Sequence, residues 1–164
     1  MKWLTALNSR LSRWAMYLAV AGLLGIVVVV VYGVVLRYVF NDSQPYVEQV
    51  ALILVIIVAM FGASAGVRDE GHIGMESLVG LLPERPRFAV GVIVGLLTIA
   101  FGALLFGGCL MMATSVANNT IPTLGISEAF RYVPPVIAGV LIILFSIEHL
   151  IAMFRKSKVV KSWH

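Results

Sequence analysis

Five ionisable side chains inside or near the long apolar stretches of this chain are candidates for a functional role. These candidates are Arg37, Glu48, His72, Glu148 and His149. Glu148 is the most informative of them, because it is the one acidic residue inside an apolar stretch. An ionised carboxylate at the centre of a bilayer costs at least about 2.5 to 3.5 kcal/mol. Glu148 therefore requires a polar partner or a position near the membrane surface.

Two interpretations of Glu148 follow from the sequence. In the first, Glu148 or His149 forms a hydrogen bond or salt bridge with another helix, on this chain or on a neighbouring one. In the second, interfacial water reaches the carboxyl group. Arg155 shares a helix face with Glu148 but lies about 10 Å away along the axis, which is too far for a direct ion pair.

The other three candidates border the apolar stretches. Arg37 and Glu48 flank a short hairpin, and they are expected to pair with each other or with a partner subunit. His72 follows the second stretch with Asp69 and Glu70, and it is a candidate for fixing the segment after that helix. The alternative for each is a solvated charge, worth about 0 to 1 kcal/mol when paired. We predict structural or subunit-interface roles for these residues.

Residues that could support catalysis or bind a cofactor are scarce. Cys109 is the single cysteine, so neither a disulfide nor a thiolate metal site is expected within the chain. A haem held by two histidines requires imidazoles on facing helices. Of the three histidines only His149 lies in an apolar stretch. We therefore expect no enzymatic activity, no substrate site, no metal and no cofactor.

Four long apolar stretches must position these residues. They cover residues 14–36, 49–67, 88–117 and 132–154. At about 1.5 Å per residue, a helix of this length crosses a hydrocarbon core of roughly 30 Å. Hydrophobic residues make up 60% of the 164 positions and charged residues 12%, with a mean hydropathy of +1.00, which excludes a soluble protein. The sequence predicts one all-α integral membrane domain over residues 1–164, with four transmembrane helices.

The basic residues predict the orientation of these helices, because Lys and Arg are retained on the cytoplasmic side of a membrane during insertion. With four spans, both termini and the middle loop share one side, which holds 10 of the 12 basic residues. We therefore predict cytoplasmic N and C termini. The net charge of +4 reflects this topology, and the basic ends can contact anionic membrane lipids. Nucleic acid is not expected as a partner.

Two cytoplasmic segments have amphipathic patterns and are predicted to lie flat in the membrane interface. They cover residues 1–13 and 73–83. The alternative is that they are ordinary turns leading into the spans. On the opposite side, residues 118–125 predict a loop, and Ser127 is a candidate N-cap for a short helix. GxxxG spacing at Gly62 and Gly66, and at Gly91 and Gly95, favours close helix packing in general over a specific dimer seam.

Several motifs resemble those of one transporter family. They are RYVFN at residues 37–41, YVEQ at 46–49, RDEGHI at 68–73, PTLGI at 122–126 and YVPP at 132–135. In order and spacing they resemble the small membrane subunit (Q subunit, DctQ-like) of TRAP transporters, the tripartite ATP-independent periplasmic transporters. The resemblance covers nearly the whole chain. The chain departs from the family pattern at Tyr46, at Glu48-Gln49 and at Val133, where the family commonly has Trp, paired acids and Leu.

The resemblance implies a division of labour among three proteins. A periplasmic binding protein captures an organic acid, a large multi-span subunit moves it with a sodium gradient, and the small subunit braces the large one in the bacterial inner membrane. This chain would then be an accessory scaffold without a substrate site of its own. Two other classes remain as alternatives from the residues, namely the membrane anchor of a redox complex and a small autonomous transporter. The apolar helices offer no polar route for the latter.

Overall fold

The structure consists of long helices. A computed structural model describes residues 2–42, 44–69 and 84–154, and this part of the chain contains no β-strand. The elements are α1 (Lys2–Val39), α2 (Pro45–Asp69), α4 (Glu84–Ser115), the short 3₁₀ helix η1 (Glu128–Tyr132) and α5 (Val133–Phe154). By length and composition, four of the helices in this described part can cross a membrane. The predicted all-α, four-span fold class is confirmed.

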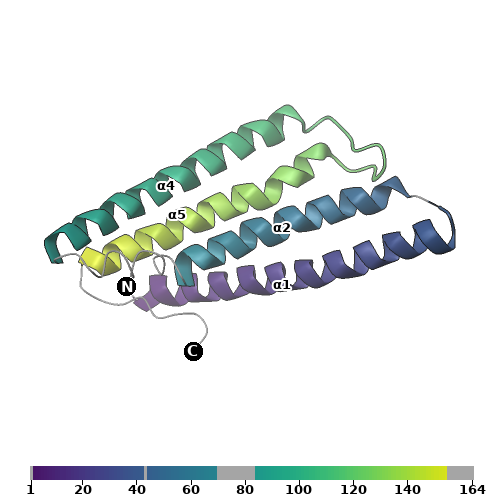
Figure 1. Ribbon diagram of the computed structural model, residues 1–164. Coiled ribbons are helices and arrows are strands. Elements are labelled where there is room, and N and C mark those ends of the chain that lie inside the picture. Colours follow the sequence, from purple (N-terminus) through teal and green to yellow (C-terminus); the bar gives the residue numbers. More distant parts are fainter. Residues whose placement is uncertain (1, 43, 70–83, 155–164) are drawn as a thin grey trace.

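The four long helices run alternately up and down, and they pack in the order α1, α2, α5, α4. Two antiparallel hairpins, α1–α2 and α4–α5, meet along α2 and α5 (Figure 1). The N-terminal end of α1 lies beside the C-terminal ends of α2 and α5 (Figure 1). We call this the N-terminal end of the molecule, and the opposite end, with the connections at 40–44 and 116–127, the loop end.

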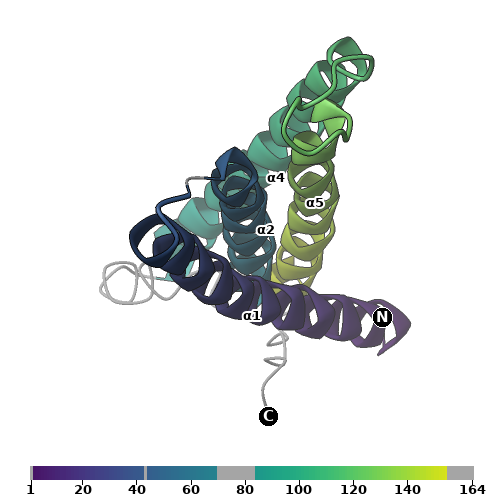
Figure 2. The same cartoon turned by 90° about the vertical axis from the view of Figure 1, so that its right-hand side faces the viewer.

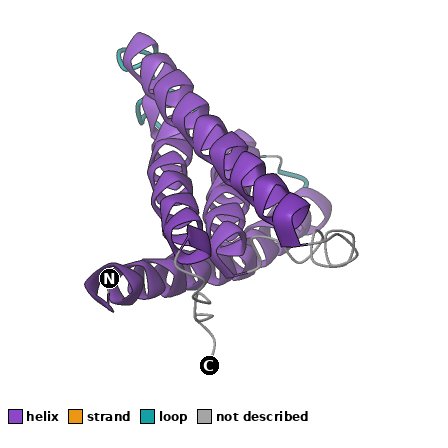
Figure 3. Cartoon of the chain, turned by 90° about the vertical axis from the view of Figure 1, so that its left-hand side faces the viewer, coloured by secondary structure: helices purple, strands orange, loops and turns teal. Residues whose placement is uncertain are grey.

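Helix α1 leans across its neighbours. Seen from the loop end, its N-terminal part passes the ends of both α2 and α5 (Figure 2), and the view from the N-terminal end shows the same crossing (Figure 3). Residues 2–13 of the predicted amphipathic segment are part of this helix, because Lys2–Val39 forms one continuous element and no Gly or Pro precedes Gly22. The placement of residues 1–13 flat in the interface stays a prediction. The segment 73–83 and His72 lie outside the described residues.

Glycine allows α4 and α5 to pack with their backbones close together. A Cβ added to Gly139 of α5 would lie 2.9 Å from the backbone nitrogen of Phe106 and 3.0 Å from the carbonyl oxygen of Gly102. The GxxxG pair Gly91 and Gly95 faces Met153 and Leu150 of α5, so this pair serves packing within the chain. Lipid offers no hydrophobic drive between helices, and small residues supply the close van der Waals contact instead.

The connection from α4 to α5 is held by its own hydrogen bonds. Ser127 is the N-cap of η1, as predicted, because its Oγ accepts a hydrogen bond from the backbone nitrogen of Ala129. The same hydroxyl donates to the carbonyl oxygen of Ala117. Gly125 has a φ of 65°, a left-handed conformation that favours glycine. The loop therefore leads into α5 along a defined path.

Most of the apolar surface of this chain faces outward. In the most apolar window of α1 only 11% of the residues are buried, against 39% in α5. The apolar core is small and lies where α1, α2 and α5 meet, with Phe145 and Ala65 fully buried. Lipid or another protein must cover the remainder, because a soluble monomer rarely exposes so large an apolar area.

Candidate functional site

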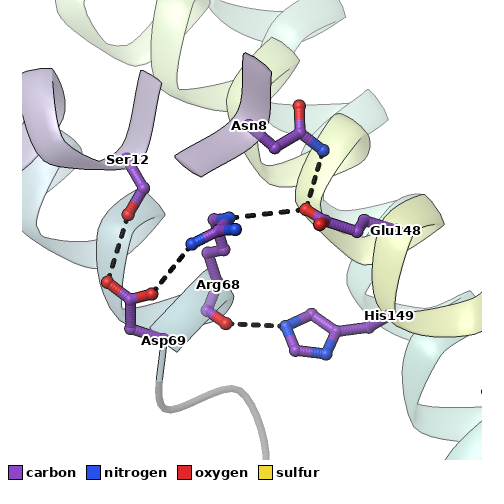
Figure 4. A network of polar contacts seen from close by, with 6 residues as sticks. All are labelled: Asn8, Ser12, Arg68, Asp69, Glu148 and His149. Carbon is purple, nitrogen blue, oxygen red and sulfur yellow. Dashed lines mark hydrogen bonds and ion pairs between the residues drawn. The ribbon is translucent and has the colours of Figure 1, made fainter. Parts of the chain in front are cut away.

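The main polar feature of the structure lies beside that core, at the N-terminal end of the molecule. It brings together six residues from three helices (Figure 4), and we call it the polar clamp. Its members are Asn8 and Ser12 of α1, Arg68 and Asp69 of α2, and Glu148 and His149 of α5. The clamp thus joins the α1–α2 hairpin to α5.

Arg68 is the centre of the clamp. Its side chain is 1% exposed and contacts two carboxylates, with Nη1 3.1 Å from Oδ1 of Asp69 and Nε 3.4 Å from Oε2 of Glu148. The two carboxylate side chains are themselves only 7% and 5% exposed. Charges this deeply buried require partners, because their desolvation costs several kcal/mol per ion.

Helix α1 supplies one polar group to each of these carboxylates. Nδ2 of Asn8 donates a hydrogen bond to Oε2 of Glu148 at 2.8 Å, and Oγ of Ser12 donates to Oδ2 of Asp69 at 3.2 Å. Among the described residues Oε1 of Glu148 has no hydrogen-bond partner. The carboxylate of Glu148 therefore depends on Arg68 and Asn8.

His149 caps the end of α2. Its Nε2 lies 2.8 Å from the carbonyl oxygen of Arg68. A carbonyl oxygen only accepts, so Nε2 carries the hydrogen of this bond. Arg68 lies in the last turn of α2 (Pro45–Asp69), where helix carbonyl groups commonly accept hydrogen bonds from outside the helix. The side chain of His149 in α5 therefore supplies a hydrogen-bond donor to a carbonyl group in the last turn of α2.

A second polar contact joins α2 to the α4–α5 hairpin at the loop end. Nη2 of Arg131 donates to Oε1 of Gln49, and Nη1 of Arg131 lies 3.6 Å from Oε1 of Glu128. Nearby, the hydroxyl groups of Tyr32 and Tyr46 lie 3.3 Å apart and link α1 to α2. Both hairpins are thus tied together at the loop end as well.

The four predicted site residues that the structure describes fall into two groups. Glu148 and His149 lie in the polar clamp and bond to other helices of the same chain. Arg37 and Glu48 are exposed at the loop end, and no ion pair joins these two described side chains. An internal Arg37–Glu48 pair is therefore not formed in the isolated chain.

Sequence reasoning missed four members of the clamp. In the sequence, Arg68 is one of the 10 basic residues that predict the orientation, whereas in the structure its side chain is buried against two acids. Asn8 and Ser12 belong to the segment predicted to lie flat in the membrane interface, where the sequence assigns them no role, and they are 3% and 0% exposed. One feature of the sequence indicates the Arg68–Glu148 pair. Each of these residues lies near the end of an apolar stretch, on the same predicted side of the membrane.

The chemistry of this arrangement is structural. The described residues contain no group of three or more His, Cys, Asp or Glu side chains able to hold a metal ion. The clamp joins one guanidinium with two carboxylates that are closed off from solvent. Such a cluster orients the helices that it joins.

Replacing Asn8 by alanine is expected to lower the free energy of unfolding by about 1.5 to 3 kcal/mol, the usual worth of a hydrogen bond to a charged group. Glu148 would then keep only Arg68 as a polar partner. Ser9→Ala is the matched control, because Ser9 is the next residue and lies outside the clamp. Thermal unfolding of the purified chain in detergent measures both, and equal midpoints for the two variants would contradict the assigned bond.

Comparisons with known proteins give a consistent result. The family model described as "Tripartite ATP-independent periplasmic transporters, DctQ component" matches residues 26–156. A putative TRAP transporter small permease protein of Haemophilus influenzae is 26% identical over 133 residues, which are 79% of this chain and 81% of that protein. The C4-dicarboxylate TRAP transporter small permease protein DctQ of Vibrio cholerae is 30% identical over 76 residues, 46% of this chain and 33% of that protein. The sialic acid TRAP transporter permease protein SiaT of Haemophilus influenzae is 29% identical over 92 residues, 54% of this chain and 14% of that protein.

Proposed function

This chain belongs to the DctQ family of TRAP transporter small subunits, and on that basis we propose that it is the stationary brace of a larger transport permease. The observation that carries the proposal is the polar clamp, which fixes three helices to one another through buried charges. A transport pathway needs polar groups along the membrane. In the described helices, the Asp, Glu, Lys, Arg and His side chains lie toward the helix ends instead.

The proposed partner is a large multi-span permease of the same transporter. The apolar surface of α1 and α4 exceeds what a small core can bury, so a membrane partner and lipid would share it. In SiaT, 92 residues similar to this chain amount to 14% of a much longer permease protein. That arrangement supports a small unit working beside a large one.

In this proposal the substrate chemistry lies in the partners. A periplasmic binding protein would deliver an organic acid, and the large permease would carry it inward with a sodium gradient. The small subunit would contribute a fixed surface against which the mobile part of the permease moves. A catalytic role is not proposed, and neither is a cofactor.

Orientation and contact residues complete the proposal. The chain would lie in the bacterial inner membrane with both termini in the cytoplasm, which places the polar clamp on the cytoplasmic side. Arg37 and Glu48 would then face the periplasm, exposed and ready to contact the large permease or the binding protein. His72 would help to fix the cytoplasmic segment that follows α2.

Affinity purification of the tagged chain from its native membrane in mild detergent tests the proposal. We expect a large polytopic permease to co-purify. After reconstitution with the binding protein, we expect organic-acid uptake that requires a sodium gradient, and uptake should fall to background when the small subunit is omitted. Co-purification of a flavoprotein or an iron–sulfur protein would indicate a redox anchor instead. Transport by the chain alone would indicate an autonomous transporter.

A further inference from the structure

The first turns of α1 have two sharply different faces. One face is buried against α2 and α5 and carries Asn8, Ser12, Ala15 and Ala19. The opposite face is exposed and carries Arg10, Arg13, Trp14 and Tyr17. Their spacing of i, i+3, i+4 and i+7 places these four side chains in one stripe along the helix.

The chemistry of the exposed stripe fits a phosphate group at a membrane surface. Arg10 and Arg13 are about one turn apart, and a guanidinium binds phosphate oxygens through paired N–H donors. Among the described residues, no salt bridge engages either arginine. Trp14 is 68% exposed and Tyr17 is 59% exposed, and such rings prefer the depth of lipid headgroups. Positive charge and amphipathic rings therefore meet on one surface.

The order of groups along α1 matches the order of groups in a phospholipid. Beyond the arginines and the rings, the same face becomes apolar, with Leu24 and Val28 exposed at 63% and 67%. Val28 follows Arg10 by five full helical turns, a distance of about 27 Å along the axis. Headgroup phosphate, glycerol region and acyl chain can thus lie in sequence along one stripe.

We propose that this face of α1, from Arg10 and Arg13 through Trp14 and Tyr17 to Val28, is a binding site for an anionic phospholipid. Charge complementarity selects the occupant, because each basic residue near an anionic membrane surface contributes roughly 1 kcal/mol. The bound lipid would fix the height and rotation of α1 in the bilayer. Asn8 and Ser12 lie on the back of the same turns, so the lipid would also support the polar clamp.

Quenching of Trp14 fluorescence by brominated lipids tests the site directly. The full chain carries Trp3→Phe and Trp163→Phe, so that Trp14 alone reports, and it is reconstituted in mixtures of phosphatidylglycerol and phosphatidylcholine. Bromine is placed on the acyl chains of one lipid at a time. We expect phosphatidylglycerol to be enriched at least about fivefold over phosphatidylcholine beside Trp14, because one arginine contact alone gives a preference of about this size.

Matched variants separate the site from general surface charge. Arg10→Gln with Arg13→Gln should reduce the enrichment to near unity, whereas Arg10→Lys with Arg13→Lys should keep most of it. Arg87→Gln removes an exposed arginine from the first turn of α4 and should leave the enrichment unchanged. Equal quenching by the two lipids in the chain that retains both arginines would overturn the proposal. So would an unchanged preference in the double glutamine variant with intact helical circular dichroism.

Discussion

Replacing Arg68 by methionine is expected to lower the free energy of unfolding by about 3 to 5 kcal/mol, because it leaves buried carboxylates without their cation. Asp69 and Glu148 are 7% and 5% exposed at the side chain, so water cannot easily take the place of the guanidinium. The thermal midpoint of the purified chain should fall by on the order of 10 °C. The amount of large permease that co-purifies with the tagged chain should fall as well.

Two controls make the Arg68 result specific. Arg87→Met removes an exposed arginine and should change the free energy of unfolding by less than about 0.5 kcal/mol. The double variant Arg68→Met with Glu148→Met should be more stable than Arg68→Met alone, because a buried ion pair replaced by apolar groups of similar shape is often nearly neutral. Additive losses in the double variant would show that Arg68 and Glu148 do not interact.

Replacing Gly139 by leucine is expected to destabilise the chain by about 3 kcal/mol or more, since overpacking a tight contact forces backbones apart. Even the Cβ would meet three backbone atoms of α4 at 2.9, 3.0 and 3.1 Å, none of which can rotate away. Gly139→Ala should also destabilise, by about 1 to 3 kcal/mol, although alanine favours helix more than glycine does. Thermal unfolding in detergent measures both variants.

Gly107 supplies the matched control, because it also lies in a long helix but a Cβ there would meet nothing within 4 Å. Gly107→Ala should raise the free energy of unfolding by up to about 1 kcal/mol through helix propensity alone. The two alanine substitutions are therefore expected to have opposite signs. A stabilising Gly139→Ala would mean that α4 and α5 do not approach as closely as described.

The sequence predicted the four helices well, because hydrocarbon thickness sets the length of a span and composition identifies it. The helix ends were less predictable. The third span was expected at 88–117, whereas α4 begins at Glu84 and ends at Ser115. Likewise α1 begins at Lys2, ahead of the apolar stretch. An apolar run marks the membrane-spanning part of a helix, and the helix itself can extend beyond that run into polar sequence.

The polar clamp was only half predictable, and the reason is physical. Glu148 stood out because an acid in an apolar stretch is costly wherever it lies. Asn8 did not, since a polar residue on an amphipathic segment can face water or a buried carboxylate with the same local pattern. Its role depends on α1 leaning across α2 and α5, and that crossing follows from tertiary packing. Pairing between helices distant in sequence leaves little trace in local periodicity.

Helix α2 is fastened to the α4–α5 hairpin at both ends, by Arg68 with Glu148 of α5 at one end and by Gln49 with Arg131 of η1 at the other. The residues Gln49 and Arg68 are separated by about 28 Å along α2. A single fastening would leave one hairpin free to swivel about it, and the second fastening removes that degree of freedom. The two hairpins therefore resist twisting relative to each other and behave as one rigid unit. A force applied at one membrane surface is then transmitted to the other.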